Sequence, residues 1–589
     1  MKYDFNSRLK DIYANPLGHD IIFRLLLQTG ISSSYINNPF VKNLKVKTLV
    51  LLLKSIDKEF IQAFLDLLNR NNEQSVKDSS TVKKAWWKEA VFYQVYPLTF
   101  NGGTLKGITE KLDYLQNLGV DALWLSPIYD SPNDDNGYDI RDYQKIMKSM
   151  GTMKDFDKLL SEAHRRGLKL IIDLVVNHTS DEHKWFKQAI KNKTNKYHDY
   201  YIFRDKKNNW TSFFRGPAWN YYENINQYAM HLYSKKQMDL NWDNPDLRKE
   251  VINMIKWWLE KGVDGFRMDT INTISKMDGL PDGNEKIGNL IGFTGMEHYF
   301  YGPHLHEYLK QIRKEAFEPY KAFCVGETPG IGLELSKLLT NESRKELDMI
   351  FSFDHLETPG HKRYDNYKYD LNFLKKYYID CIENGGKGNR LTLFFENHDN
   401  PRMPSKVSKD CTYSRYISKL LAVMQLTLVG TPFIYQGQEL GETNKKFKSI
   451  KDIKDVEGIN LYNELLKTKT PKEAFDVILC GTRDHARQPI NWKDAEKNEV
   501  HEFFVKLIRL RKKSRVFVYG DFRAVHKKSK NLFTYYRSNE NEKFYIECNL
   551  CNKIISRPNS HEKRSLILSN YEQIDKQLRP YEANIYKVQ

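Results

Sequence analysis

The stretch Gly262-Val-Asp-Gly-Phe-Arg-Met-Asp-Thr-Ile-Asn272 says most about the fold of this chain. Side chains alternate between the two faces of an extended segment, so Arg267 and Asp269 should project from the same face. A neighbouring cation lowers the pKa of a carboxyl group, and we therefore expect Asp269 to be ionised. An ionised carboxylate at the end of a strand could act as a nucleophile. The alternative is an Asp–Arg pair that only caps a strand.

Short apolar runs alternate with amphipathic helical segments from residue 86 onward, which indicates parallel strands in β-α units. The predicted strands are residues 91–95, 122–125, 168–176, 265–268, 323–325, 349–351, 391–395 and 432–435. The predicted helices between them include residues 108–118, 153–166 and 247–261. This order predicts a (β/α)8 barrel, in which the active site lies at the carboxyl ends of the strands.

Polar side chains gather where four of these apolar runs stop. The third run leads into Asp173-Leu-Val-Val-Asn-His178, and the fourth ends with Arg267 and Asp269. The fifth ends with Glu327, and the seventh leads into Glu396-Asn-His-Asp399. Solvated strand ends more often carry Lys, Ser or Gly. The repeated Asp, Glu, His and Arg residues therefore predict one shared site.

Three further units flank or interrupt the predicted barrel, which we assign to residues 84–513. Residues 1–83 form an N-terminal helical appendage and linker, with a helix start at Asn15 and apolar segments at 21–27, 44–53 and 60–68. Residues 179–236 form an inserted subdomain rich in Trp, Tyr and Asn, which suits sugar rings but could equally hold its own small core. Residues 514–589 form a β-rich C-terminal domain.

The composition excludes several classes of protein. The chain has 589 residues and a net charge of +17, but its Lys residues are scattered among acids, so we expect a solvated basic surface and no nucleic-acid binding. No apolar run approaches the roughly 20 residues that span a membrane. The N-terminus lacks the pattern of a signal peptide, and six cysteines do not make a disulfide framework, so we expect a cytoplasmic protein.

One cysteine pair allows two interpretations. Cys548 and Cys551 have the spacing of half a zinc site, and only His561 lies near them in the sequence. No second pair with this spacing follows. Two reduced thiols are the favoured interpretation.

Several carboxyls around one bond are suitable for glycoside hydrolysis. In the retaining reaction a nucleophile and an acid/base stand about 5–5.5 Å apart. Asp269 suits the nucleophile. Glu327 follows an apolar strand, and its burial would raise its pKa, as a proton donor at neutral pH requires. Asp399, beside His398, could hold sugar hydroxyls and stabilise the transition state.

The sequence resembles the α-amylase family of glycoside hydrolases (glycoside hydrolase family 13), and within it the oligo-1,6-glucosidases and α-glucosidases. The resemblance runs from about residue 86 to the end of the chain. The matching stretches include Asp173-Leu-Val-Val-Asn-His-Thr-Ser180, Gly265-Phe-Arg-Met-Asp269, Val325-Gly-Glu327, Glu396-Asn-His-Asp-Asn-Pro-Arg402, Gln237-Met-Asp-Leu-Asn-Trp242, Ser131-Pro-Asn-Asp-Asp-Asn-Gly-Tyr-Asp139 and Gly481-Thr-Arg-Asp-His-Ala-Arg487.

The resemblance implies a role for each site residue. It assigns Asp269 as nucleophile, Glu327 as general acid/base and Asp399 as transition-state stabiliser. The residues that it places around the terminal glucose are Asp135, Tyr138, His178, Phe214, Tyr233, Gln237, Arg267, Thr270, His398 and Arg483. An Asp135–Arg483 pair that closes the pocket would make the enzyme exo-acting.

Two positions depart from the family pattern or refine it. Relatives commonly carry a metal-binding loop after the first strand, but here Phe100-Asn-Gly-Gly-Thr-Leu105 contains no carboxylate, so we expect no metal and no cofactor. A bound ion in this loop would contradict that expectation. Thr270 follows the nucleophile, and in similar enzymes Thr or Ala here accompanies α-1,4 linkages and Val accompanies α-1,6 linkages. The resemblance thus favours α-1,4 substrates.

Other functions remain as alternatives. Within the family they are an oligo-1,6-glucosidase, a trehalose-6-phosphate hydrolase or a sucrose-acting enzyme. Amino-acid transporter heavy chains share the fold without catalysis, but they should have a membrane helix and altered catalytic positions. This chain keeps Asp269, Glu327 and Asp399, so a hydrolase of small oligosaccharides is favoured. The oligomeric state is not predicted.

Overall fold

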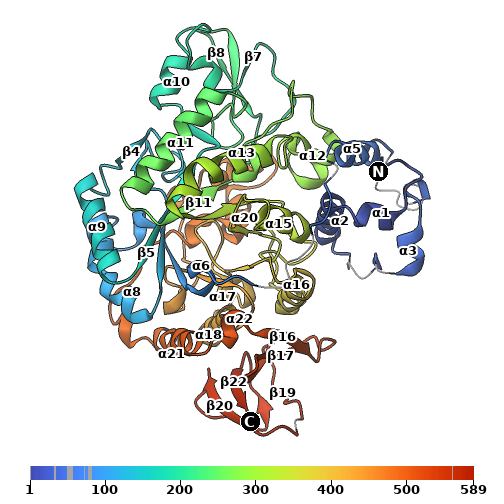
Figure 1. Cartoon of the computed structure of the whole chain (residues 1–589), viewed down its shortest axis with the longest axis vertical. Helices are drawn as coiled ribbons and strands as arrows, with labels where there is room; N and C mark the ends of the chain where they lie inside the picture. The colour runs from blue at the N-terminus through green and yellow to red at the C-terminus, as the bar shows by residue number, and fades with distance from the viewer. Residues whose placement is uncertain are drawn as a thin grey trace.

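The computed structural model describes residues 2–31, 35–36, 38–48, 58–71, 73–76, 82–559 and 561–589. At its centre, eight parallel strands form a nearly closed barrel, as the sequence predicts (Figure 1). They run in the order β13-β12-β11-β5-β2-β1-β15-β14. The strands are β1 (Phe92–Val95), β2 (Ala122–Leu125), β5 (Lys169–Val175), β11 (Gly265–Asp269), β12 (Phe323–Glu327), β13 (Met349–Phe351), β14 (Thr392–Leu393) and β15 (Thr431–Tyr435).

The barrel closes through side chains where β13 and β14 meet. The Thr392 hydroxyl donates to the Ile350 carbonyl at 2.9 Å and so bridges the two strands. β14 is shorter than the predicted run 391–395 because other groups satisfy its backbone. The Gln425 amide, for example, donates to the carbonyls of Leu393 and Phe433. A side chain thus replaces part of the missing ladder.

Helices cover the outside of the barrel. α9 (Met153–Arg165) and α11 (Pro245–Glu260) lie where they are predicted. The predicted helix 108–118 is instead two helices, α7 (Leu105–Glu110) and α8 (Leu112–Leu118), which meet at Lys111. The later helices are α13 (Leu305–Ile312), α15 (Leu333–Thr340), α16 (Leu371–Asn384), α18 (Ser414–Thr427), α19 (Val456–Leu465), α20 (Pro471–Gly481) and α21 (Glu499–Lys513).

The inserted segment and the C-terminal segment each contain an antiparallel sheet. In the insertion, helix α10 (Lys184–Ala189) accompanies β7 (Phe203–Arg204), β8 (Trp219–Tyr222) and β9 (Gln227–Met230). The aromatic residues of this segment do form a small core, with Trp210 and Trp219 buried in it. The C-terminal sheet consists of β16 (Asp521–Val525), β17 (Leu532–Ser538), β18 (Lys543–Asn549), β22 (Ala583–Val588) and β20 (Arg564–Ser569), in this order.

The N-terminal residues form helices beside the barrel (Figure 1). These are α1 (Leu9–Tyr13), α2 (Pro16–Thr29), α3 (Pro39–Asn43) and α5 (Lys58–Arg70). Asn15 caps α2 by accepting from the Gly18 N–H at 3.0 Å, so the predicted helix start is confirmed. Much of the predicted segment 44–53 and of the linker lies outside the described residues. No helix in the described part of the chain could cross a membrane.

Candidate active site

Two neighbouring strand ends carry Asp269 and Glu327. Asp269 is the last residue of β11, and Glu327 is the last residue of β12. These strands pair in parallel, so both carboxyls leave the barrel at the same end. Both residues are buried, with 5% and 8% of their surface exposed. The fold therefore sets two buried carboxyls next to each other.

The buried Arg267 connects three carboxyls. Its Nη1 donates to Asp269 Oδ1 and to Asp173 Oδ1, both at 2.6 Å. Its Nη2 lies 2.8 Å from Glu327 Oε2. Because a guanidinium group is planar, its two terminal nitrogens fix the positions of these carboxyls relative to one another.

Thr270 contacts both strand-end carboxyls. Its backbone N–H donates to Glu327 Oε2 at 3.0 Å, and its hydroxyl donates to Asp269 Oδ2 at 3.3 Å. Its φ of 40° and ψ of 36° lie in the left-handed region, which β-branched residues rarely adopt. The backbone is strained at this position, as is common beside catalytic groups.

Burial and neighbouring charge give the two carboxyls different pKa values. Burial raises the pKa of Glu327 to about 8, in agreement with the expectation for a proton donor. Burial also raises the pKa of Asp269 to about 6, although Arg267 opposes this shift. Arg267 lowers the pKa of Asp269 as predicted, but the net shift is upward because the loss of hydration outweighs the cation. At neutral pH, Asp269 is still ionised and Glu327 is protonated.

Asp399, in the loop after β14, is surrounded by basic groups. Its Oδ1 accepts from Arg487 Nη2 at 2.6 Å and from Arg483 Nη1 at 3.4 Å. Its Oδ2 lies 3.1 Å from His398 Nε2. Burial favours the neutral acid, but His398, Arg487 and Arg483 together hold the pKa of Asp399 well below its usual range. The site therefore contains an ionised carboxylate whose side chain is 24% exposed.

Arg483 links further acids into a buried cluster. Its Nη2 lies 3.1 Å from Asp135 Oδ1 and 2.7 Å from Asp455 Oδ1. The ring of Phe214 lies 5.0 Å from the guanidinium carbon. The predicted Asp135–Arg483 pair is thus present, and Asp455 extends it.

Tyr138 and His398 connect this cluster to strands β5 and β1. The Tyr138 hydroxyl lies 2.6 Å from His398 Nε2 and donates to Asp173 Oδ2 at 3.1 Å. The two rings stack with their centroids 5.4 Å apart. On the other side of the imidazole, Gln94 Nε2 lies 2.7 Å from Nδ1. Burial lowers the pKa of His398 to about 3, so the ring is neutral at physiological pH.

His178, Gln237 and Tyr233 complete the set. Gln237 Nε2 donates to Asp135 Oδ2 at 3.2 Å and lies 3.2 Å from His178 Nε2. Tyr233 lies between the rings of His178 and Phe214, with centroid distances of 5.2 and 5.7 Å. Every residue that the sequence analysis places in the site therefore belongs to one connected network.

The sequence analysis missed four members of this network, one of which, Gln94, lies in the predicted first strand. Asp173 and Arg487 lie within the family-like stretches, so their charge inside a motif was a usable signal. Asp455 precedes α19 and lies in no such stretch. Its contact with Arg483 arises only from tertiary packing.

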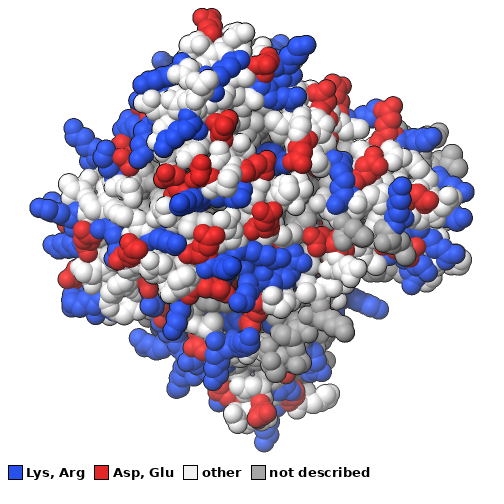
Figure 2. Space-filling model, turned by 45° about the horizontal axis from the view of Figure 1, so that its top comes forward, with Lys and Arg blue, Asp and Glu red and all other residues white. Residues whose placement is uncertain are grey.

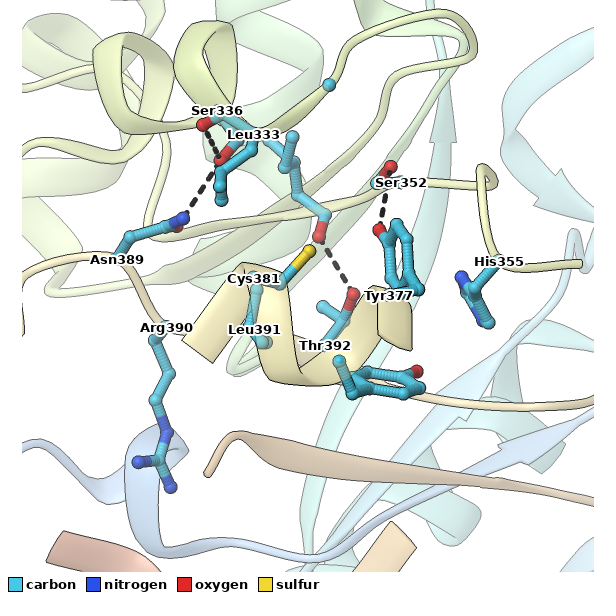
Figure 3. Close-up of a pocket in the computed structure, with 13 residues that line it drawn as sticks. Leu333, Ser336, Ser352, His355, Tyr377, Cys381, Asn389, Arg390, Leu391 and Thr392 are labelled. Atoms are coloured by element: carbon cyan, nitrogen blue, oxygen red, sulfur yellow. Dashed lines mark hydrogen bonds between the residues drawn. The ribbon is translucent and has the colours of Figure 1, made fainter. Parts of the chain in front are cut away.

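Two small cavities lie within the barrel and its covering helices, and neither is large enough for a sugar. A cavity of about 30 Å³ lies between α15, α16 and the meeting point of β13 and β14 (Figure 3). A smaller one of about 10 Å³ lies inside the barrel, beside Arg267 and Trp124. These volumes suit one or two water molecules.

The described residues contain no cluster of His, Cys, Asp and Glu side chains suited to a metal ion. Cys548 and Cys551 are free thiols. The absence of a metal at residues 100–105 stays a prediction.

Comparison with known proteins gives consistent matches. A family model for the alpha amylase catalytic domain matches residues 67–520. An oligo-1,6-glucosidase from Parageobacillus thermoglucosidasius is 42% identical over 86% of this chain and 100% of its own length. An alpha-glucosidase from Pediococcus pentosaceus is 44% identical over 71% of this chain and 78% of its own length. The crystal structure of a trehalose-6-phosphate hydrolase from Bacillus licheniformis is similar with a TM-score of 0.79 and 37% identity, over 86% of this chain and 100% of that one.

Proposed function

Because this chain belongs to the α-amylase family of glycoside hydrolases, we propose that it is a retaining, exo-acting α-glucosidase that releases glucose from short α-glucosides. The observation that carries this proposal is the Arg267 guanidinium, which holds Asp269 and Glu327 together while their pKa values differ. One carboxyl is a base at neutral pH and its neighbour is an acid. That combination is what a retaining glycosidase requires.

In the first step, an Asp269 carboxylate oxygen attacks the anomeric carbon of the terminal glucose. The glycosidic bond breaks as Glu327 gives its proton to the leaving oxygen. This produces a glucosyl ester on Asp269 and a free alcohol. Both carboxyls contact the same guanidinium group, and this closeness supports the retaining route, because an inverting enzyme needs room for water between them.

In the second step, water attacks the ester from the face that the alcohol has left. Glu327, now ionised, takes a proton from this water and returns to its acid form. The bond to Asp269 breaks, and glucose leaves with its original anomeric configuration. Thr270 donates to both carboxyls and would keep them aligned through both steps.

Asp399 acts as the transition-state stabiliser in this proposal. It is ionised and partly exposed, and Arg487 and Arg483 fix its orientation. A carboxylate held in this way can accept hydrogen bonds from glucose hydroxyls, which strengthen as the ring becomes oxocarbenium-like. The neutral His398 and Tyr138 lie beside it and offer further polar contacts.

The Asp135–Arg483–Asp455 cluster supports exo action. These buried charges neutralise one another, and a buried ion cluster at the end of the glucose site would block a continuing sugar chain on that side. Gln237, His178, Phe214 and Tyr233 adjoin the cluster and would surround the terminal glucose. A closed end of this kind selects the terminal residue of a short chain.

The proposal includes a preference for α-1,4 over α-1,6 linkages. This preference rests on Thr270, because Thr at this position accompanies α-1,4 linkages in similar enzymes. The relatives carry several activities in their names, including oligo-1,6-glucosidase and alpha-glucosidase, so oligo-1,6-glucosidase is the second candidate.

Six free cysteines support a cytoplasmic location.

The test is glucose release from maltose, isomaltose, sucrose, trehalose and trehalose 6-phosphate. Asp269→Asn should lose at least about four orders of magnitude in kcat/KM if a covalent step is required. Asp278→Asn, with a side chain that is 79% exposed, is the matched control and should keep full activity. Maltose cleavage above isomaltose cleavage supports the proposal. A preference for isomaltose would overturn the linkage preference alone, and an active Asp269→Asn protein would overturn the mechanism.

A further inference from the structure

The N-terminal helix α2 makes a specific contact with the barrel helix α15 (Figure 1). The carboxylate of Asp20, on α2, accepts from the Glu334 N–H at 3.1 Å and from the Leu335 N–H at 2.8 Å. Asp20 is 2% exposed. These N–H groups belong to the first turn of α15, where a helix has no internal partners for its donors.

The sequence of α15 does not provide a cap of its own. Its N-cap residue is Gly332, which has no side chain to accept a hydrogen bond. A Cβ at position 332 would lie only 2.7 Å from the Asp20 carboxyl carbon. Glycine therefore leaves the space that the Asp20 carboxylate fills, and the cap comes from a segment more than 300 residues away in the sequence.

This helix directly follows the strand that ends at Glu327. Residues 328–332 connect β12 to α15. Within the connection, the Thr328 N–H and hydroxyl both bond to the Phe351 carbonyl of β13, at 3.3 and 3.2 Å. The backbone after Glu327 is thus held by β13 on one side and by the start of α15 on the other.

A small cavity adjoins the first turn of α15. Gly332, Leu333 and Ser336 line this cavity of about 30 Å³ (Figure 3). The Ser336 hydroxyl donates to the Leu333 carbonyl and accepts from the Asn389 amide. Leu335, Leu338 and Leu339 are fully buried and hold the body of the helix, whereas the N–H groups of its first turn are held by the Asp20 cap.

A second contact of α2 reaches the loop after β13. Arg24 forms an ion pair with the buried Asp354, and the Leu27 carbonyl accepts from the Gly360 N–H at 2.7 Å. Farther along this loop, Arg363 donates to the Asp399 carbonyl oxygen at 3.3 Å. The same helix therefore contacts the segments that follow β12, which ends at Glu327, and β13, whose loop reaches Asp399 through Arg363.

We propose that α2 is a brace for the active site and that Asp20 is a positioning residue for the acid/base Glu327. Asp20 fixes the first turn of α15, and through residues 328–332 this fixes the carboxyl that protonates the leaving group. The family match begins at residue 67, so this brace lies outside the part shared with the family. The inference rests on the role of Glu327 in the proposed function.

The experiment compares two substrates of the full-length protein. In maltose the leaving group is a sugar alcohol, which needs a well-placed proton donor. In a dinitrophenyl α-glucoside the leaving group is a dinitrophenolate, which leaves with almost no help from a proton donor. In Asp20→Ala, kcat/KM on maltose should fall on the order of tenfold, as expected for the loss of a helix cap. On the aryl glucoside, kcat/KM should stay within about twofold. Asp20→Asn keeps one acceptor oxygen and should show a smaller effect.

Matched variants separate the possible results. Asp66→Ala removes an exposed carboxylate on α5 of the same appendage and should leave kcat/KM on both substrates unchanged. Glu327→Gln should show the same selective loss on maltose, only larger. If Asp20→Ala lowers kcat/KM equally on both substrates, or on neither, the positioning role is wrong. If Asp20→Ala does not fold, the same comparison with Asp20→Asn decides. If Glu327→Gln itself shows no selectivity, the proposed function fails independently of Asp20.

Discussion

At the scale of single residues, the site depends on burial as much as on charge. Glu327 and Asp269 contact the same guanidinium, yet the pKa values of both lie above their usual range because both have lost water. Arg267 limits this shift and does not reverse it. The more exposed Asp399 shows the opposite result, since several basic groups surround it. Each acid thus has a protonation state that fits one step of the reaction.

These pKa values predict a bell-shaped dependence of kcat/KM on pH. Activity should fall below about pH 6 as Asp269 gains a proton, and above about pH 8 as Glu327 loses one. Glu327→Gln cannot ionise, so the alkaline limb should disappear from the residual activity on an aryl glucoside. Initial rates between pH 4 and 10 test this. An unchanged alkaline limb in the variant would assign that ionisation to another group.

Thr270 combines strain with two contacts to the catalytic carboxyls. Thr270→Val keeps the shape of the side chain but removes the hydroxyl bond to Asp269. We expect kcat/KM on maltose to fall on the order of tenfold, and the ratio of isomaltose to maltose activity to rise. Parallel kinetics on the two disaccharides measure this ratio. An unchanged ratio would remove position 270 as a determinant of linkage.

At the scale of elements, a buried ion pair holds the loops around the site together. Lys276, in the loop after β11, lies 2.9 Å from Asp239 Oδ2 and donates to Asn177 Oδ1 at 2.9 Å. Asp239 ends β10 (Gln237–Asp239), which pairs with β6 (His178–Ser180). One ammonium group therefore connects the segments after β5 and β11 to β10, which directly follows the insertion.

Loss of this ammonium should destabilise the protein. Lys276→Met leaves Asp239 buried without its cation, which typically costs about 3–5 kcal/mol. Urea unfolding of the variant, with exposed Lys235→Met as the control, measures the difference. A change below about 1 kcal/mol would mean that the Leu232 N–H and the Asn177 amide satisfy Asp239 without the cation.

The elements also show how far the sequence determines the result. The order and ends of the barrel strands follow from apolar runs that stop at polar residues, and both could be predicted. The break at Lys111 and the short β14 could not: the break is a local change of backbone angles at Lys111, and at β14 the Gln425 side chain takes the place of a backbone partner. Asp455 was missed for a similar reason, since only folding brings it to Arg483. Contacts between distant segments leave no local pattern.

At the scale of the whole molecule, the chain has a net charge of +17, but basic side chains do not cover the face seen in Figure 2 without interruption. Acidic side chains are interspersed among the basic ones over much of the face seen in Figure 2. We therefore predict no saturable binding of a labelled DNA duplex at micromolar protein and about 0.15 M salt, as measured by fluorescence anisotropy. Tight binding with a steep salt dependence would show that a basic surface acts on nucleic acid.

The central claim is that Asp269 forms a covalent bond to glucose. The most direct measurement is mass spectrometry of the digested protein after reaction with a fluorinated α-glucosyl fluoride, whose glycosyl-enzyme hydrolyses slowly. We predict a fluoroglucosyl label on the peptide that contains Asp269, and no label in Asp269→Asn. A label on a different side chain, or turnover of the compound without any label, would contradict the claim.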